Sequence, residues 1–255
     1  MKKTILITGA GSGIGRATAI VMASQPDTQL ILIGRRAEEL EKTQKQLNRS
    51  EEHFICAFDV RDKLEWRKAL QDISASSLNF SGLFANAGIG GENKYGEEDR
   101  WSDIISTNLD GTYITIKECL PYFKISKEKY KHVVITSSCL ARFGVPKYTA
   151  YCTAKAGLLG LTKSLAVELA QDNILVNAIC PGWVETEMAQ AGIQMLADAT
   201  GNPYGLEFEQ QMSYVPLQKM SQPEEIGQLV SFLMSNLQTS MTGQSFDINN
   251  GSFMI

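Results

Sequence analysis

Short apolar runs alternate along the chain with longer segments whose apolar residues recur at helical spacing. The apolar runs predict buried strands at residues 3–8, 30–33, 53–58, 83–85, 132–136, 174–179 and 243–248. The segments between them predict helices at 16–24, 37–48, 62–73, 99–122, 148–170 and 223–234. This alternation predicts an α/β fold, a three-layer doubly wound parallel sheet (Rossmann-like) in a single domain over residues 1–255.

The segment from about 183 to 215 has no strong period, and we expect it to form a lid over the substrate site. Its methionines and aromatic residues favour an adaptable, mostly apolar pocket, although the same side chains would also serve to pack lid helices. It contains no lysine or arginine, so the lid itself is not expected to clamp a substrate carboxylate. Arg142 and Lys147, which lie between Ser138 and Tyr151, are weak candidates for binding a substrate carboxylate.

The polar and glycine residues that stand out lie where the predicted strands end. In a parallel sheet, ligands bind at the carboxyl ends of the strands. The residues at these ends include Gly9 to Gly15, Gly34-Arg35-Arg36, Asp59, Asn86, Ser138 and Pro181-Gly182. Their coincidence at one edge predicts a ligand site there.

The first strand runs into a glycine-rich turn, Thr8-Gly9-Ala-Gly-Ser-Gly13-Ile-Gly15. A turn that brings a helix N-terminus close to phosphates needs glycine for positive φ and close approach. The spacing differs from the ordinary G-x-G-x-x-G pattern, and a tight strand–helix turn without a ligand is the alternative.

Tyr151 and Lys155 are four residues apart, so on a helix they share one face. A neighbouring ammonium favours phenolate, and we expect the pKa of Tyr151 to fall from about 10 toward neutrality. Such a tyrosine exchanges a proton with a carbonyl or alcohol oxygen. The alternative is a solvated pair on a helix surface.

Composition narrows the function classes. The net charge of −4 and the pI near 5.4 argue against nucleic acid as a partner. The five cysteines form no Cys-x-x-Cys pair and the two histidines are isolated, so neither a metal site nor a disulfide framework is expected. With no run of 18 apolar residues and no secretory signal, we expect no membrane partner and a cytoplasmic location.

Taken together, the motifs resemble the short-chain dehydrogenase/reductase family in its compact single-domain form. The resemblance covers essentially the whole chain. It rests on six motifs in one order: Thr-Gly-x-x-x-Gly-x-Gly, Asn86-Ala-Gly, Asn108, Ser138, Tyr151-x-x-x-Lys155 and Pro181-Gly182.

The resemblance implies catalytic roles for four residues. Tyr151 would be the general acid in reduction and the base in oxidation, and Ser138 would hold the substrate oxygen. Lys155 would lower the pKa of Tyr151 and bind the nicotinamide ribose. Asn108 would anchor a water that links Lys155 to solvent, although an asparagine inside a helix can equally mark a kink.

The resemblance also implies a cofactor site. The turn would contribute Gly9, Ser12, Gly13, Ile14 and Gly15. Asp59 would meet the adenine through its side chain and Val60 through its backbone. Asn86, Ala87 and Gly88 would line the adenosine side and steady the sheet, and Pro181, Gly182, Val184 and Thr186 would lie along the nicotinamide.

Cofactor choice depends on the residues after the second strand. An acidic residue there would repel a 2′-phosphate, whereas this chain has Gly34, Arg35 and Arg36. Guanidinium groups match phosphate geometry, so we expect NADP(H), with NAD(H) as the alternative and Arg35 ahead of Arg36. Ser12 stands where many NADP-dependent relatives carry a basic residue.

The expected activity is hydride transfer between NADP(H) and a small-molecule ketone or secondary alcohol, in the manner of 3-oxoacyl or polyketide ketoreductases. The alternatives are an NAD-linked alcohol or hydroxyacid dehydrogenase and a non-catalytic cofactor-sensing protein. The family is usually oligomeric, so a homotetramer or homodimer is expected. The apolar end, Phe253-Met-Ile255, suits either a subunit interface or packing on its own domain.

Overall fold

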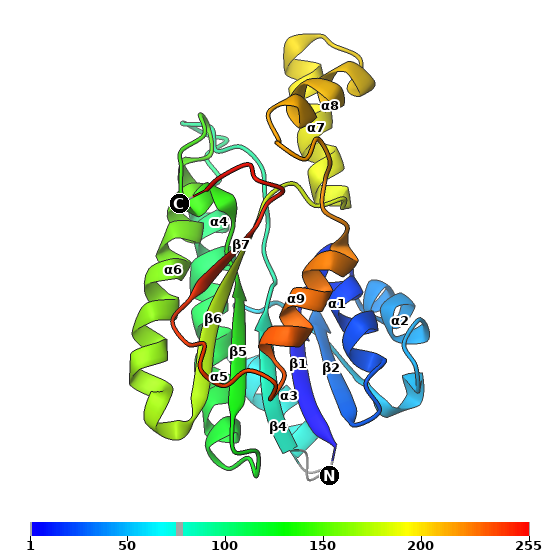
Figure 1. Ribbon diagram of the computed structural model, residues 1–255, viewed down its shortest axis with the longest axis vertical. Helices are drawn as coiled ribbons and strands as arrows, with labels where there is room; N and C mark the ends of the chain where they lie inside the picture. The colour runs from blue at the N-terminus through cyan, green and yellow to red at the C-terminus, as the bar shows by residue number, and fades with distance from the viewer. Residues whose placement is uncertain (1, 75–78, 255) are drawn as a thin grey trace.

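A computed structural model describes residues 2–74 and 79–254. Over these ranges seven strands form one parallel sheet in the order β3-β2-β1-β4-β5-β6-β7 (Figure 1). The strands are β1 (Lys3–Thr8), β2 (Thr28–Gly34), β3 (Phe54–Ala57), β4 (Asn79–Ala85), β5 (Lys131–Thr136), β6 (Ile174–Pro181) and β7 (Ser245–Ile248). The order reverses between β1 and β4, which confirms the predicted doubly wound α/β fold.

The α-helices that the structure describes follow the predicted order. They are α1 (Gly13–Ala23), α2 (Ala37–Lys45), α3 (Lys63–Ser74), α4 (Trp101–Ile105), α5 (Gly111–Lys124), α6 (Thr149–Leu169), α7 (Glu187–Thr200), α8 (Tyr204–Ser213) and α9 (Pro223–Leu233). Helix α9 begins with Pro223, and Gln222 and Glu225 form a reciprocal capping box before it. The Ser-Gln-Pro-Glu-Glu signature therefore marks the true start of this helix.

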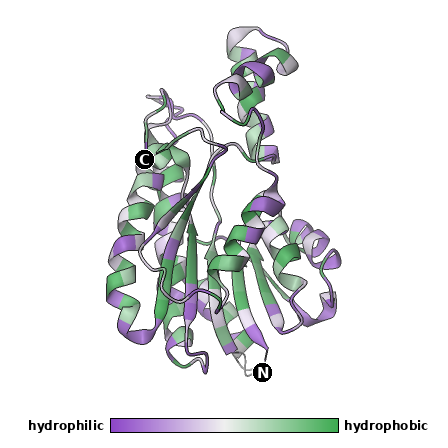
Figure 2. Ribbon diagram, in the orientation of Figure 1, coloured by the Kyte–Doolittle hydropathy of each residue, from purple (hydrophilic) through white to green (hydrophobic). Residues whose placement is uncertain are grey.

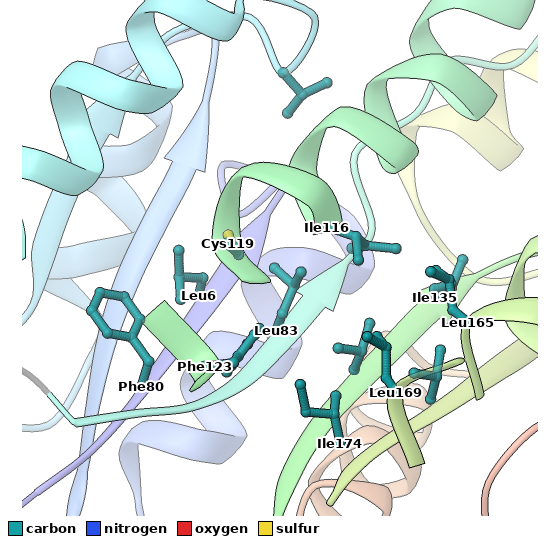
Figure 3. Packing of buried hydrophobic residues seen from close by; sticks show 14 of the residues in the cluster. Leu6, Phe80, Leu83, Ile116, Cys119, Phe123, Ile135, Leu165, Leu169 and Ile174 are labelled. Carbon is teal, nitrogen blue, oxygen red and sulfur yellow. The ribbon is translucent and has the colours of Figure 1, made fainter. Parts of the chain in front are cut away.

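Two hydrophobic cores lie on opposite faces of the sheet. On one face α3, α5 and α6 cover the strands, and Figure 3 shows Ile116, Cys119 and Phe123 of α5 packed there with Leu6, Phe80 and Leu83. On the other face α1, α2 and α9 contribute Met22, Leu40, Ile226 and Val230, among others. Because both faces are covered, the strands are apolar along their length, whereas the outer faces of the helices carry the polar residues (Figure 2).

Two expected elements differ from the structure. Strand β4 begins at Asn79 rather than at Leu83, because Ser81 and Gly82 interrupt the apolar pattern but are still suited to a buried strand. The Ser81 hydroxyl donates to the carbonyl of Thr4, and Gly82 leaves room for Ile5. The helix expected over 99–122 is divided by a π-helical turn at Ser106–Asp110, where the chain takes one wider turn around Asn108.

The segment between β6 and α9 extends beyond the carboxyl ends of the strands as α7 and α8 (top of Figure 1). These helices have a small core of their own, formed by Ala189, Ile193, Met212, Val215 and Met220. The two ends of this excursion are tied together by a bridge between Val184 and Ser221. No helix in the described ranges is sufficiently long and apolar to cross a membrane.

Candidate active site

The glycine turn between β1 and α1 has the geometry that its spacing predicts. Gly9 has a φ of +66°, which glycine adopts without strain. A Cβ on Gly15 would lie 2.1 Å from the carbonyl oxygen of Gly9, so no other residue fits there. The Ser12 side chain makes no capping hydrogen bond at the start of α1. Since the first N–H groups of a helix lack intrahelical partners, this end of α1 is suited to hold a pyrophosphate.

Arg16, which sequence reasoning passed over, holds the turn against α2. Its guanidinium donates to the carbonyl of Gly11, to Glu39 Oε2 at 2.8 Å and to Thr43 Oγ1 at 3.0 Å. Thr43 in turn donates to the carbonyl of Ala10 at 2.9 Å. The signal for this role was its position directly after the last glycine of the turn.

Arg35 and Arg36 follow β2 with exposed side chains. The carboxylate of Asp59, which follows the neighbouring strand β3, is held by Arg61 at 3.0 Å (Nε to Oδ1) and 2.8 Å (Nη2 to Oδ2). These hydrogen bonds from Arg61, with a smaller electrostatic contribution from Arg35, keep the pKa of Asp59 below its usual value. Arg61, also missed from the sequence, therefore orients the carboxylate predicted to meet the adenine, and Val60 beside it is buried.

Asn86 connects three strands at the centre of the sheet. Its Nδ2 donates to the carbonyl of Thr8 on β1 at 3.2 Å, and its Oδ1 accepts from Thr136 Oγ1 on β5 at 3.1 Å. The backbone N–H groups of Asn86 and Ala87 both donate to Thr8 Oγ1. This accounts for the expected steadying of the sheet.

The π-helical turn positions Asn108 against the loop after β4. Its Oδ1 accepts from the backbone N–H of Ile89 at 2.8 Å, and its Nδ2 donates to the carbonyl of the same residue at 2.9 Å. A Cβ on Gly88 would lie 2.9 Å from Asn108 Oδ1 and 3.7 Å from Lys155 Nζ. Gly88 thus leaves room for Asn108 and Lys155 to approach each other. The π-helical turn confirms the kink at Asn108, whereas its role in anchoring a water beside Lys155 stays a prediction.

Ser138, Tyr151 and Lys155 come together at the ends of β5 and α6. Lys155 Nζ donates to the carbonyl of Thr136 at 2.8 Å and lies 5.5 Å from the centre of the Tyr151 ring. Ser138 Oγ accepts from the N–H of Leu140 at 3.1 Å. Ser137, the weaker serine candidate, donates instead to the carbonyl of Lys155 and so fixes α6 to β5.

The expected direction of the Tyr151 pKa is wrong. Burial raises the pKa of this phenol to about 12, against a hydrogen bond with Ser138 that acts to lower it. Burial also lowers the pKa of Lys155 to about 8. The spacing of four residues does place the two groups on one face, but desolvation outweighs their attraction because Lys155 Nζ points to a backbone carbonyl. Tyr151 is therefore a phenol, a proton donor, at neutral pH.

The segment expected along the nicotinamide leads from β6 into α7. A Cβ on Gly182 would lie 2.9 Å from Asn249 Cβ, and Val184 is buried. The Thr186 side chain caps α7 by accepting from the N–H of Ala189, and its methyl group would lie 3.0 Å from a Cβ on Gly13. The start of α7 therefore lies against the glycine turn between β1 and α1.

Both candidates for a carboxylate clamp have acidic partners in this structure. Arg142 donates to Ser245 Oγ at 2.6 Å and pairs with Asp247, and Lys147 pairs with Glu92 at 3.6 Å. At the chain end, Phe253 stacks on Phe143 within its own chain with ring centres 5.6 Å apart. Ile255, the last residue of the predicted apolar end, lies outside the described residues.

The comparison with known proteins identifies the family. The sequence model of the family described as "short chain dehydrogenase" matches residues 3–196, and this chain belongs to that family. It is an NAD(P)-dependent oxidoreductase, as expected from the motifs. The catalytic and cofactor-binding roles given above to individual residues stay predictions.

Individual relatives cover nearly the full chain. The chain is 30% identical to 3-oxoacyl-[acyl-carrier-protein] reductase FabG of Staphylococcus aureus, over all of this chain and 99% of the relative. It is 31% identical to the FabG of Thermotoga maritima, over 98% and 97% of the two chains. Among solved structures, a single-residue variant of actinorhodin polyketide ketoreductase with NADPH has a TM-score of 0.91 at 29% identity, over 98% and 97%. Levodione reductase has a TM-score of 0.89 at 26% identity, over 98% and 96%.

Proposed function

We propose that this protein is an NADP(H)-linked ketoreductase that reduces the carbonyl of a small molecule with Tyr151 as the proton donor. One observation carries the proposal: Ser138, Tyr151, Lys155 and Asn108 converge at the carboxyl edge of the sheet, where Gly88 leaves room for the last two to approach each other. The similarity to FabG and to the polyketide ketoreductase supports the same reaction class.

The chain provides positioning and proton transfer. The glycine turn and residues 181–186 would hold a nicotinamide cofactor, which would supply the hydride for the carbonyl carbon. Ser138 holds the carbonyl oxygen, and Tyr151 gives its phenolic proton to that oxygen as negative charge develops there. Lys155 stabilises the resulting phenolate, and Asn108, fixed by its two hydrogen bonds to the Ile89 backbone, lies near the lysine beside Gly88.

The test of this role is Tyr151→Phe, which keeps the ring and removes the acid. We expect the rate of carbonyl reduction to fall at least about 100-fold, since general acids contribute roughly 10² to 10⁴. NADPH binding, followed by quenching of protein fluorescence, should survive. Substantial turnover in this variant would refute the assignment of Tyr151.

The preference for NADP(H) is tested at Arg35, whose exposed guanidinium follows β2. A charge-assisted hydrogen bond contributes about 1.5 to 3 kcal/mol. Arg35→Ala should therefore raise the KM for NADPH by roughly 10- to 100-fold and leave the KM for NADH nearly unchanged, with Arg36→Ala as the companion variant. Equal losses with both cofactors would show that Arg35 does not contact the 2′-phosphate.

A further inference from the structure

The negative charge of the protein is concentrated in two segments beside the proposed substrate site. The chain as a whole carries a net charge of −4. The loop of residues 88–100 and the excursion of residues 183–215 together contain nine acidic and two basic residues, a net charge of −7. The rest of the chain is therefore net positive, so the acidity of this protein is a local feature.

The two segments face each other across a cavity of about 470 Å³. One wall is formed by Glu92, Glu97, Glu98 and Asp99, which we call the carboxylate rim, and Met195 of α7 lines the opposite side. The 88–100 loop starts at Gly88, against Asn108 and Lys155, and Met188 of α7 packs within 3.1 Å of a Cβ position on Gly90. Glu92 of the cavity wall also pairs with Lys147, four residues before Tyr151, so this wall is connected to the segment that carries the proposed catalytic tyrosine.

The cations near the rim are engaged. Lys94 pairs with Glu98 at 2.9 Å, Lys147 pairs with Glu92 at 3.6 Å, and Arg100 donates to the carbonyl of Gly90 at 3.1 Å. The lid contributes no cation. Within the described ranges, these contacts leave no lysine or arginine on the cavity wall without a partner for an incoming phosphate.

We propose that the carboxylate rim selects substrates by charge, so that the enzyme reduces uncharged ketones and disfavours ketones carried on phosphorylated handles such as phosphopantetheine or coenzyme A. This inference rests on the proposed ketoreductase function. A cleft lined by one sign of charge changes the encounter rates of charged ligands by roughly 10- to 1,000-fold, with a strong dependence on ionic strength. The inference departs from the carrier-protein substrate in the name of the FabG relatives.

The test compares two thioesters with the same reacting group. Acetoacetyl-N-acetylcysteamine is neutral, whereas acetoacetyl-coenzyme A carries several phosphate charges. At low salt we expect kcat/KM for the neutral thioester to be at least about tenfold higher, and we expect about 0.5 M salt to narrow this ratio because the Debye length shrinks. The salt series distinguishes electrostatic repulsion of coenzyme A from steric exclusion, because steric exclusion does not depend on ionic strength.

Charge variants test whether the carboxylate rim causes the preference for the neutral thioester. Glu97→Lys combined with Glu187→Gln changes two exposed side chains at the cavity and at the start of α7, and it should narrow the ratio severalfold at low salt. Glu168→Lys combined with Glu51→Gln makes the same change in net charge at exposed positions near the amino ends of the strands, and it should leave the ratio unchanged.

The outcomes are distinct. Equal kcat/KM for both thioesters at low salt, or a ratio that neither salt nor the rim variant alters, overturns the charge selection while leaving the ketoreductase function intact. If neither thioester nor a neutral free ketone is reduced with NADPH, the proposed function fails and the selection fails with it.

Discussion

The buried ammonium of Lys155 is expected to destabilise the folded protein. Its side chain is 4% exposed, and burial lowers its pKa from 10.5 to about 8. At 1.36 kcal/mol for each pKa unit, this shift corresponds to about 3 kcal/mol of unfavourable free energy at pH 7, where the lysine is protonated in both states. Replacing it with methionine removes this cost and loses a charge-assisted hydrogen bond to Thr136 of at least about 1.5 kcal/mol. Lys155→Met should therefore be more stable than the wild type by up to about 2 kcal/mol.

The stabilisation by Lys155→Met should depend on pH, because Lys155 has different pKa values in the folded and unfolded states. Because the pKa of Lys155 is lower in the folded state, the unfolded chain binds more protons between pH 8 and 10.5. The contribution of Lys155 to the free energy of unfolding therefore rises with pH across that window. The advantage of Lys155→Met should be constant below pH 8 and should largely disappear by about pH 10.5.

The assay is urea unfolding of wild type and Lys155→Met, followed by circular dichroism at a series of pH values without added cofactor. In thermal unfolding, about 2 kcal/mol corresponds to roughly 4 to 8 °C for a chain of this size. Lys163→Met, an exposed position on the same helix, is the matched control and should change stability little at any pH. A variant less stable than wild type at pH 7, or a difference that does not vary with pH, would refute the claim that the Lys155 ammonium is desolvated.

Two further predictions concern the packing of glycines and the capping of α9. Gly15→Ala should abolish NADPH binding or folding, since its methyl group would meet the Gly9 carbonyl at 2.1 Å, whereas Gly160→Ala, with nothing within 4 Å, should stabilise α6 by about 0.5 to 1 kcal/mol. Cofactor titration and thermal unfolding of both variants measure this, and normal NADPH affinity in Gly15→Ala would contradict the packing. Glu225→Ala removes one half of the capping box at α9 and should lower the free energy of unfolding by about 1 kcal/mol without changing KM for NADPH; a change in KM with unchanged stability would contradict a purely structural cap.

The sequence predicted the strands and the residues at their ends because both depend on local pattern. The apolar runs of a sheet covered on both faces are continuous, so β1, β5 and β6 were recognisable within a few residues. The start of β4 was missed, since Ser81 is buried through a hydrogen bond to Thr4, a partner more than seventy residues away in the chain. Helices were expected in the excursion, but the bounds of α7 and α8 were not predicted, because their small core is divided between α7, α8 and Met220.

At the candidate site, it was easier to predict which residues lie together than to predict their pKa values. Spacing placed Tyr151 and Lys155 on one face, yet it gave the wrong direction for the tyrosine pKa, which depends on how deeply α6 is buried. The same limit applies to Asp59, because the clamp by Arg61 depends on a turn geometry that the letters Asp-Val-Arg do not specify.

The bridge between Val184 and Ser221 makes the excursion of α7 and α8 a closed detour in the path of the chain. The backbone N–H of Ser221 donates to the carbonyl of Trp183, and that of Glu185 donates to the carbonyl of Ser221, so the chain leaves and rejoins the sheet at nearly one point. We expect that a detour closed in this way can be lengthened, shortened or exchanged with that of a relative without moving β6 or α9. If the excursion acts as the predicted substrate lid, chimaeras joined at this bridge should carry the substrate range of the relative that donates it.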